Sequence, residues 1–109
     1  MSIRLPAAID LYFSSENAYD ASAIDRCFVG DAIVRDEGKI IKGVAAIKTW
    51  RLETGGKYHH AVEPIALSTR GGKVVVASRV SGDFPGSPIN LDHIFEIEGD
   101  RIVSLEIRP

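Results

Sequence analysis

The sequence has little cysteine and no long apolar run. Of its 109 residues only one is a cysteine, Cys27, which excludes an internal disulfide and cannot form a thiolate metal site alone. No apolar segment approaches the roughly 20 residues of a membrane-spanning helix, and the N-terminus lacks the pattern of a signal peptide. We therefore expect a reduced, cytoplasmic protein that does not associate with membranes, with Cys27 as a small core residue.

The sequence also lacks a concentration of charge. Its 13 basic and 15 acidic residues give a net charge of -2, and the basic ones are scattered, so no nucleic-acid partner is expected. It has no glycine-rich phosphate loop and no Ser/His/Asp signature. His59 and His60 point to opposite faces of a predicted strand and His93 is remote in sequence, so we expect no metal and no cofactor.

Apolar residues are plentiful and predict one globular domain over residues 1–109, with three helices. Ile9, Tyr12, Phe13 and Glu16 recur at helical spacing after Pro6, which predicts a first helix ending near residue 17.

Two shorter patterns predict the other helices. Asp20 is suited to cap a helix with an apolar stripe of Ile24, Cys27 and Phe28, which we expect Gly30-Asp31 to break. In a third helix, which starts after Gly43, the residues Val44, Ile47 and Trp50 share a face, and Gly55-Gly56 is expected to end it.

Asp36 ends a predicted strand in the stretch Ala32–Gly38. Because strand side chains alternate between faces, Ala32, Val34 and Asp36 share one face, so Asp36 points inward if the other two do. Desolvation would then raise its pKa toward the range useful for proton transfer. The alternative is that Asp36, close before Gly38, only forms a turn by bonding its own backbone.

The second half of the chain has the period of two that is typical of strands. A short strand, Lys39–Lys42, closes a hairpin, and four longer strands follow, the first with a bulge at Pro64. Val74 to Ala77 is apolar on both faces, which predicts a sheet covered on both sides. The pattern predicts an α+β fold in which a long, curved, mostly antiparallel sheet wraps around the N-terminal helices as a conical barrel and encloses a pocket.

Few polar side chains are directed inward by these patterns. They are Tyr12, Asp36, Tyr58, His60 and one of the pair Asp92 and His93. Alternation favours an inward row of Leu91, His93, Phe95 and Ile97.

Several segments carry a family resemblance over nearly the whole chain: the helix with Tyr12, the Asp20 corner, Cys27 to Ala32, Asp36-Glu37-Gly38, Lys42 to Ile47, and the closing hairpin Leu91 to Ile107 with Arg101-Ile102. In these the chain resembles the nuclear transport factor 2-like superfamily, in its SnoaL-like and ketosteroid-isomerase-like branch. That superfamily includes isomerases, cyclases, dehydratases and noncatalytic binding proteins, so the resemblance implies the fold more specifically than the function.

The resemblance implies roles for individual residues. Tyr12 matches the oxyanion-hole tyrosine of ketosteroid isomerases and Asp36 their general base, while Trp50 matches an aromatic pocket position. The acid that forms the other half of the oxyanion hole in these isomerases aligns with Asp92 or with Leu91, depending on how the closing hairpin is aligned. Phe28 and Arg51 stand nearest to the tyrosines of the isomerase network, so steroid isomerisation itself is not expected.

We therefore expect a small-molecule-binding protein, with Asp36 as general acid/base of an isomerase- or cyclase-like reaction and Tyr12 holding a substrate oxygen. The residues expected to line the pocket are Phe13, Phe28, Trp50, Tyr58, His60, His93 and Phe95. The competing hypothesis is a noncatalytic dimeric binding or accessory protein. In either case we expect a homodimer that buries the sheet around Arg79 and Ile94, because the outer sheet face is a common dimer surface in the family.

Overall fold

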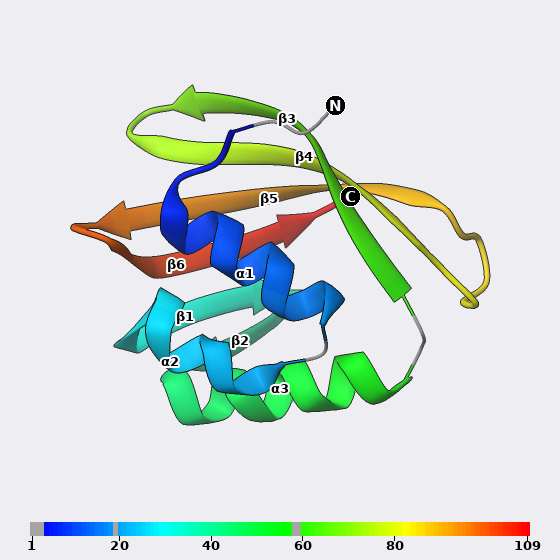
Figure 1. The fold of residues 1–109 in the computed structure, drawn as a ribbon, viewed down its shortest axis with the longest axis horizontal. Helices are drawn as coiled ribbons and strands as arrows, with labels where there is room; N and C mark the ends of the chain where they lie inside the picture. The colour runs from blue at the N-terminus through cyan, green and yellow to red at the C-terminus, as the bar shows by residue number, and fades with distance from the viewer. Residues whose placement is uncertain (1–3, 19, 58–59) are drawn as a thin grey trace.

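The structure is a computed structural model that describes residues 4–18, 20–57 and 60–109, and it consists of helices packed against one six-stranded sheet (Figure 1). The elements in chain order are α1 (Ala7–Asn17), the 3-10 helix η1 (Ala21–Ala23), α2 (Ile24–Cys27), β1 (Phe28–Asp36), β2 (Lys39–Lys42), α3 (Val44–Lys57), β3 (His60–Arg70), β4 (Lys73–Gly82), β5 (Ile89–Glu98) and β6 (Arg101–Arg108). Within the described residues, no helix is long and apolar enough to cross a membrane.

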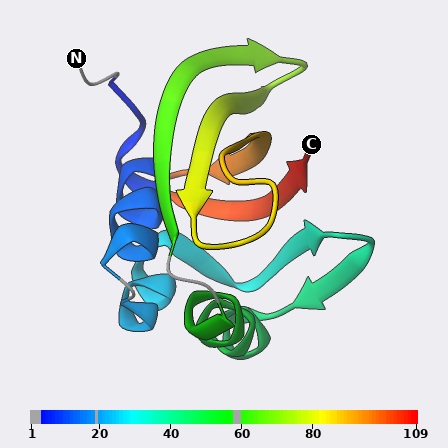
Figure 2. The same cartoon turned by 90° about the vertical axis from the view of Figure 1, so that its right-hand side faces the viewer.

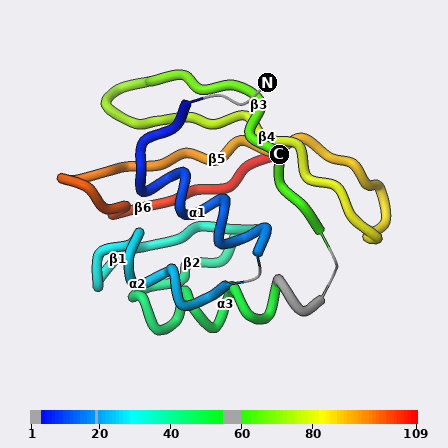
Figure 3. The backbone as a smooth tube through the Cα atoms, in the orientation of Figure 1, coloured from blue at the N-terminus to red at the C-terminus, as the bar shows by residue number. Residues whose placement is uncertain are grey.

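The strand order is β2-β1-β6-β5-β4-β3, and β1 with β6 is the one parallel pair. The α+β class and the mostly antiparallel sheet are therefore confirmed, including four successive antiparallel strands at the end of the chain. In Figure 2 the β1–β2 and β3–β4 hairpins diverge from each other at opposite edges of the sheet. The backbone trace in Figure 3 shows α1 crossing in front of the sheet and α3 lying beside the β1–β2 edge.

The first two helices match the sequence patterns except at one boundary. Asp20 caps η1, since its Oδ1 accepts a hydrogen bond from the Ser22 backbone N–H at 3.1 Å. The prediction that Phe28 belongs to the helical stripe and that Gly30-Asp31 breaks the helix was wrong, because all three residues lie in β1. Phe28 pairs with Ile102 of β6, and the register shift that follows it absorbs the irregular segment within the strand.

The β1–β2 hairpin fixes the orientation of Asp36. Glu37 and Gly38, with φ of 52° and 76°, form its two-residue turn, as a type I′ turn requires. Ala32 and Val34 are both fully buried, and Asp36 on the same face is partly buried. The inward parity of Asp36 is confirmed.

Helix α3 extends past its expected end. Its described bounds reach Lys57, so the prediction that Gly55-Gly56 ends it was wrong. A glycine inside a helix costs only about 1 kcal/mol relative to alanine, so it weakens a helix without having to end it. The predicted inner face holds, with Ile47 and Trp50 buried.

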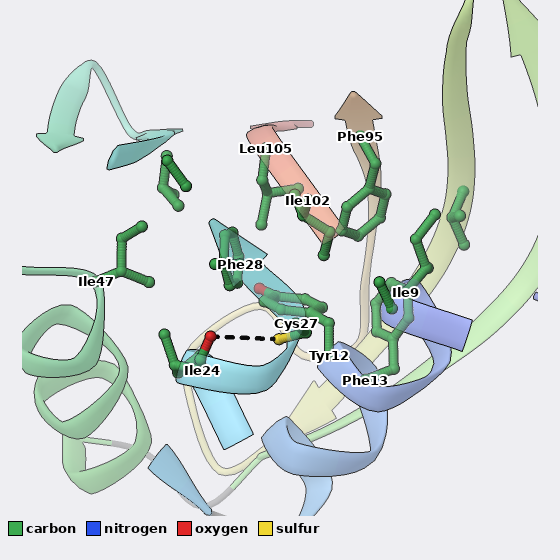
Figure 4. Packing of buried hydrophobic residues seen from close by; sticks show 14 of the residues in the cluster. Ile9, Tyr12, Phe13, Ile24, Cys27, Phe28, Ile47, Phe95, Ile102 and Leu105 are labelled. Atoms are coloured by element: carbon green, nitrogen blue, oxygen red, sulfur yellow. Dashed lines mark hydrogen bonds between the residues drawn. The ribbon is translucent and has the colours of Figure 1, made fainter. Parts of the chain in front are cut away.

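The core lies between α1, α2, α3 and the sheet, and Figure 4 shows aromatic rings from several elements meeting there. The predicted bulge at Pro64 is present as a register shift between Pro64 and Ala66. On β5, His93 and Phe95 are buried and Asp92 is exposed, which decides the open choice in favour of His93. Cys27 is buried, as expected.

Candidate functional site

Asp36 is the last residue of β1 and lies on the inner face of the strand, where a residue of α3 holds it. The Trp50 indole Nε1–H donates to Asp36 Oδ2 at 3.2 Å, while the turn itself is formed by Glu37 and Gly38. Burial raises the pKa of the Asp36 carboxyl; the Trp50 hydrogen bond opposes this shift, and the neighbouring Glu37 charge reinforces it. The result is a partly exposed carboxyl that holds a proton more readily than an ordinary aspartate.

An open surface hollow of about 260 Å³ lies beside this carboxyl. It is lined by Arg35, Asp36, Glu37, Gly38, Lys39, Ile40, Glu106 and Ile107. The hollow gives Asp36 a route to solvent, but its lining is largely charged.

Tyr12 lies deeper, in the aromatic core under α1. Its ring is fully buried and meets Phe13, Phe28 and Phe95 edge-on, with centroids 5.3, 5.9 and 5.6 Å away (Figure 4). Its hydroxyl accepts a hydrogen bond of 2.6 Å from Arg51 Nη2. Burial raises the pKa of Tyr12 well above its usual range, although the Arg51 charge opposes this, so the phenol keeps its proton.

Arg51 also belongs to a buried ion cluster with Glu16 and His60. Arg51 Nη1 and Nη2 lie 3.4 and 3.5 Å from the two carboxylate oxygens of Glu16, and His60 Nε2 lies 2.9 Å from Glu16 Oε2. Burial disfavours ionisation of Glu16, but the His60 hydrogen bond and the Arg51 charge outweigh it and hold the pKa below its usual value. The cluster joins α1, α3 and β3, and Asn17 strengthens the same junction through two hydrogen bonds with the Val62 backbone.

The guanidinium of Arg51 lies against two aromatic rings. Its Cζ is 4.7 Å from the centroid of Trp50 and 5.1 Å from that of Tyr12, within the range of cation–π attraction. Its Nε is buried and has no hydrogen-bond partner among the described protein atoms.

His93 is a buried histidine kept neutral by its surroundings. Its ring centroid lies 5.0 Å from that of Phe13, and its plane is stacked with Phe95 at 16°. Burial lowers the pKa of His93 to about 4. Its Nδ1 also lacks a partner among the described atoms.

The structure thus places the expected site residues in two connected groups. Asp36 and Trp50 form the outer group. His60 is linked through Glu16 and Arg51 to Tyr12, which belongs to the inner group. The inner group consists of the core residues Tyr12, Phe13, Phe28, His93 and Phe95. Tyr58, also expected in the pocket, lies outside the described residues.

Sequence reasoning did not assign Glu16 and Arg51 to the site. A signal for the first was present, since Glu16 falls on the inner stripe of α1, and a buried carboxylate requires a cationic or hydrogen-bonding partner. Nothing local marked Arg51 as that partner. Among residues 4–18, 20–57 and 60–109, no three His, Cys, Asp or Glu side chains are grouped so that they would hold a metal ion.

Comparison with known proteins gives matches among solved structures. No protein-family profile and no curated sequence matches the chain. A Sinorhizobium meliloti protein described as a "putative polyketide cyclase" is 38% identical, with 95% of each chain covered and a TM-score of 0.90. A Catenulispora acidiphila protein with a ketosteroid-isomerase-like fold, solved with trimethylamine, is 17% identical over 97% of this chain and 87% of its own, with a TM-score of 0.84. A Mycobacterium tuberculosis epoxide hydrolase described as "LEH-like" is 15% identical over 94% of this chain and 79% of its own, with a TM-score of 0.75.

Proposed function

Because the chain belongs to the nuclear transport factor 2-like superfamily, in its SnoaL-like and ketosteroid-isomerase-like branch, we propose that it binds a small carbonyl or cyclic compound and moves a proton on it. Asp36 is the general acid/base. The proposal includes closure of the curved sheet into a conical barrel around a ligand pocket between helices and sheet.

One observation carries this proposal: the environment of Asp36. Its carboxyl is partly buried on the inner face of β1, is oriented by the Trp50 indole, and has a raised pKa. A carboxyl that protonates closer to neutral pH is a more effective acid/base for hydrogen on carbon, because its pKa lies closer to the operating pH. Its partial exposure lets it exchange that proton with solvent.

Tyr12 is proposed to hold the substrate oxygen. It stays protonated, and because its oxygen accepts the hydrogen bond from Arg51, its own O–H is available as a donor. Since the ring is fully buried, a substrate reaches the hydroxyl only after a local shift of the side chains around it.

The family relative supports this class of chemistry. The Sinorhizobium meliloti protein is described as a polyketide cyclase, as a putative assignment. Ring closure by carbon–carbon bond formation begins with removal of a proton next to a carbonyl, which is the step proposed for Asp36. We propose an isomerase- or cyclase-like reaction without naming its substrate.

Isotope exchange tests the proposal without knowledge of the natural substrate. Cyclohexanone and 2-tetralone are incubated with the protein in D2O, and loss of the α-proton signals is followed by NMR. We expect the wild type to accelerate exchange of at least one of the ketones and Asp36→Asn to abolish the acceleration. Asp92→Asn is the matched control, because it makes the same chemical change at an exposed carboxylate of β5. Equal acceleration by wild type and Asp36→Asn contradicts the role of Asp36.

The second candidate is a noncatalytic binding or accessory protein, and the full burial of Tyr12 favours it. In that case ketones alter Trp50 fluorescence with saturation, but wild type and Asp36→Asn give the same exchange rate as buffer.

A further inference from the structure

Arg51 carries a charge in the interior that its neighbours compensate incompletely. Its side chain is 4% exposed, and its ionic contacts to Glu16 are long, at 3.4 and 3.5 Å. The same carboxylate also accepts from His60 at the shorter distance of 2.9 Å. One anion is therefore shared by two groups that donate hydrogen bonds, and among the described atoms Arg51 has a donor in excess.

The excess is located at one atom, Arg51 Nε. The terminal nitrogens of Arg51 contact Tyr12 and Glu16. Its Nε–H, although buried, has no partner among the described protein atoms. A buried charged donor without an acceptor is costly, and it binds an oxygen acceptor more strongly than the same donor in water. The rings of Trp50 and Tyr12 hold the guanidinium in place, so this donor is preorganised.

The surroundings of Arg51 offer little charge that would repel an anion. Asp36 is the carboxyl near the Trp50 side of the guanidinium, and its Oδ2 is engaged by the Trp50 indole. Glu16 is already engaged by Arg51 and His60. His93 is neutral at physiological pH and neither adds nor removes charge.

We propose that Arg51, through its Nε–H, receives the acceptor oxygen of the ligand, and that the site prefers ligands with negative charge on that oxygen, namely carboxylates and enolates. This inference rests on the proposed function, in that the ligand binds beside Asp36. Arg51 then binds the oxygen on which charge develops as Asp36 removes the proton. The proton goes to the carboxylate of Asp36, and the electron pair of the broken C–H bond becomes that of the enolate.

The proposed route to Arg51 leads past Trp50. The indole covers one side of the guanidinium, bonds Asp36, and is 9% exposed, so it separates the buried donor from the surface. A ligand that reaches Nε changes the surroundings of the indole. Because Trp50 is the single tryptophan of the sequence, its fluorescence reports this event without interference.

The test compares cyclohexanecarboxylate with the neutral cyclohexanecarboxamide, two probes of similar shape that do not absorb where tryptophan emits. Titration of the full chain followed by Trp50 fluorescence should give a dissociation constant for the carboxylate lower by about tenfold or more. Arg51→Lys keeps a cation for Glu16 but lacks Nε–H, and should lose most of this preference. Arg70→Lys, the same change at an exposed arginine at the end of β3, is the control and should keep it.

A second measurement does not depend on a variant that folds. In ¹H–¹⁵N spectra, the Arg Nε–Hε signal that is missing in Arg51→Lys is assigned to Arg51. If the variant does not fold, the signal is assigned through the backbone of the wild type. The carboxylate should move this signal downfield, as formation of a hydrogen bond to a charged acceptor does.

Several outcomes overturn the inference: equal affinity for the two probes, no binding of either, a carboxylate preference retained in Arg51→Lys, or an unmoved Arg51 Nε signal. Loss of carboxylate binding in Arg35→Lys alone also overturns it, because the anion then sits in the surface hollow. The binding titration does not measure proton exchange. Failure of the proposed catalysis therefore shows in the exchange assay, and failure of the inference shows here.

Discussion

The burial of His93 predicts a specific loss of stability in acid. The imidazole is 2% exposed and packs against Phe13 and Phe95, and burial lowers its pKa from 6.5 to about 4. Because the folded pKa lies below the unfolded one, the unfolded chain takes up the proton first as the pH falls. The stabilisation is fully present above about pH 6.5, declines as the pH falls toward 4, and is lost below that.

The magnitude follows from the two pKa values. Their separation, from 6.5 to about 4, corresponds to about 3 kcal/mol of unfolding free energy, since one pH unit is worth about 1.4 kcal/mol. This is a large share of the 5 to 15 kcal/mol, roughly, by which domains are usually stable. The effect should therefore be measurable in urea titrations monitored by circular dichroism between pH 7 and 4.

The variant His93→Leu isolates this contribution, because it replaces the imidazole by an apolar side chain of similar volume that does not titrate. Other groups titrate in both proteins, so the difference between the two unfolding free energies reports His93. That difference should change in favour of the variant by about 3 kcal/mol from pH 7 to pH 4. Both proteins are measured at the same concentration, because assembly also affects stability. Parallel curves, or an NMR titration of His93 near 6.5, would refute the reasoning.

Four further predictions concern other parts of the chain. Asp36→Asn should leave stability unchanged near pH 3 and raise it near pH 7, because a raised carboxyl pKa favours folding only at low pH; urea titrations showing a loss at pH 7 contradict this. Trp50→Ala should lower the free energy of unfolding by about 3 to 5 kcal/mol, and a loss below about 1 kcal/mol in the same assay argues against a core position. Glu37→Asn should stabilise the protein by about 0.5 to 1 kcal/mol, since Glu37 has φ of 52° in a type I′ turn that asparagine fits better; an unchanged urea midpoint is the contrary result. Finally, light scattering at micromolar concentration should give the mass of a homodimer that buries the outer sheet face around Arg79 and Ile94, and a monomer mass rejects it.

The elements of the fold were predictable because their signals are local. Alternation with a period of two gave the strands β3 to β6 and the inward row with His93 and Phe95, and the same rule placed Asp36 on the inner face of β1. Where the sequence analysis failed, tertiary pairing had overridden a local signal: Phe28 continues a helical stripe, yet it pairs with β6. The glycines at the end of α3 were likewise given more weight than their small energetic cost warrants.

The candidate site was predictable only in part. A single strand's parity and the neighbouring turn were enough to single out Asp36, and the helical stripe singled out Tyr12. The expectation that Tyr12 is open to a ligand has no local test, and in the structure the ring is enclosed by the core and its hydroxyl is bonded by Arg51.

The sequence by itself determined the period of most elements, the inner faces of β1 and β5, and the two residues with the strongest chemical signal. The tertiary structure alone decided the partners of these residues. Arg51 meets Tyr12 and Glu16 across 39 and 35 positions of the chain, and His60 meets Glu16 across 44. Periodicity acts over a few residues and fixes only which face a side chain occupies. A charged residue on a helix therefore has the same local pattern whether it is solvated or ends up, as Arg51 does, between two rings in the core.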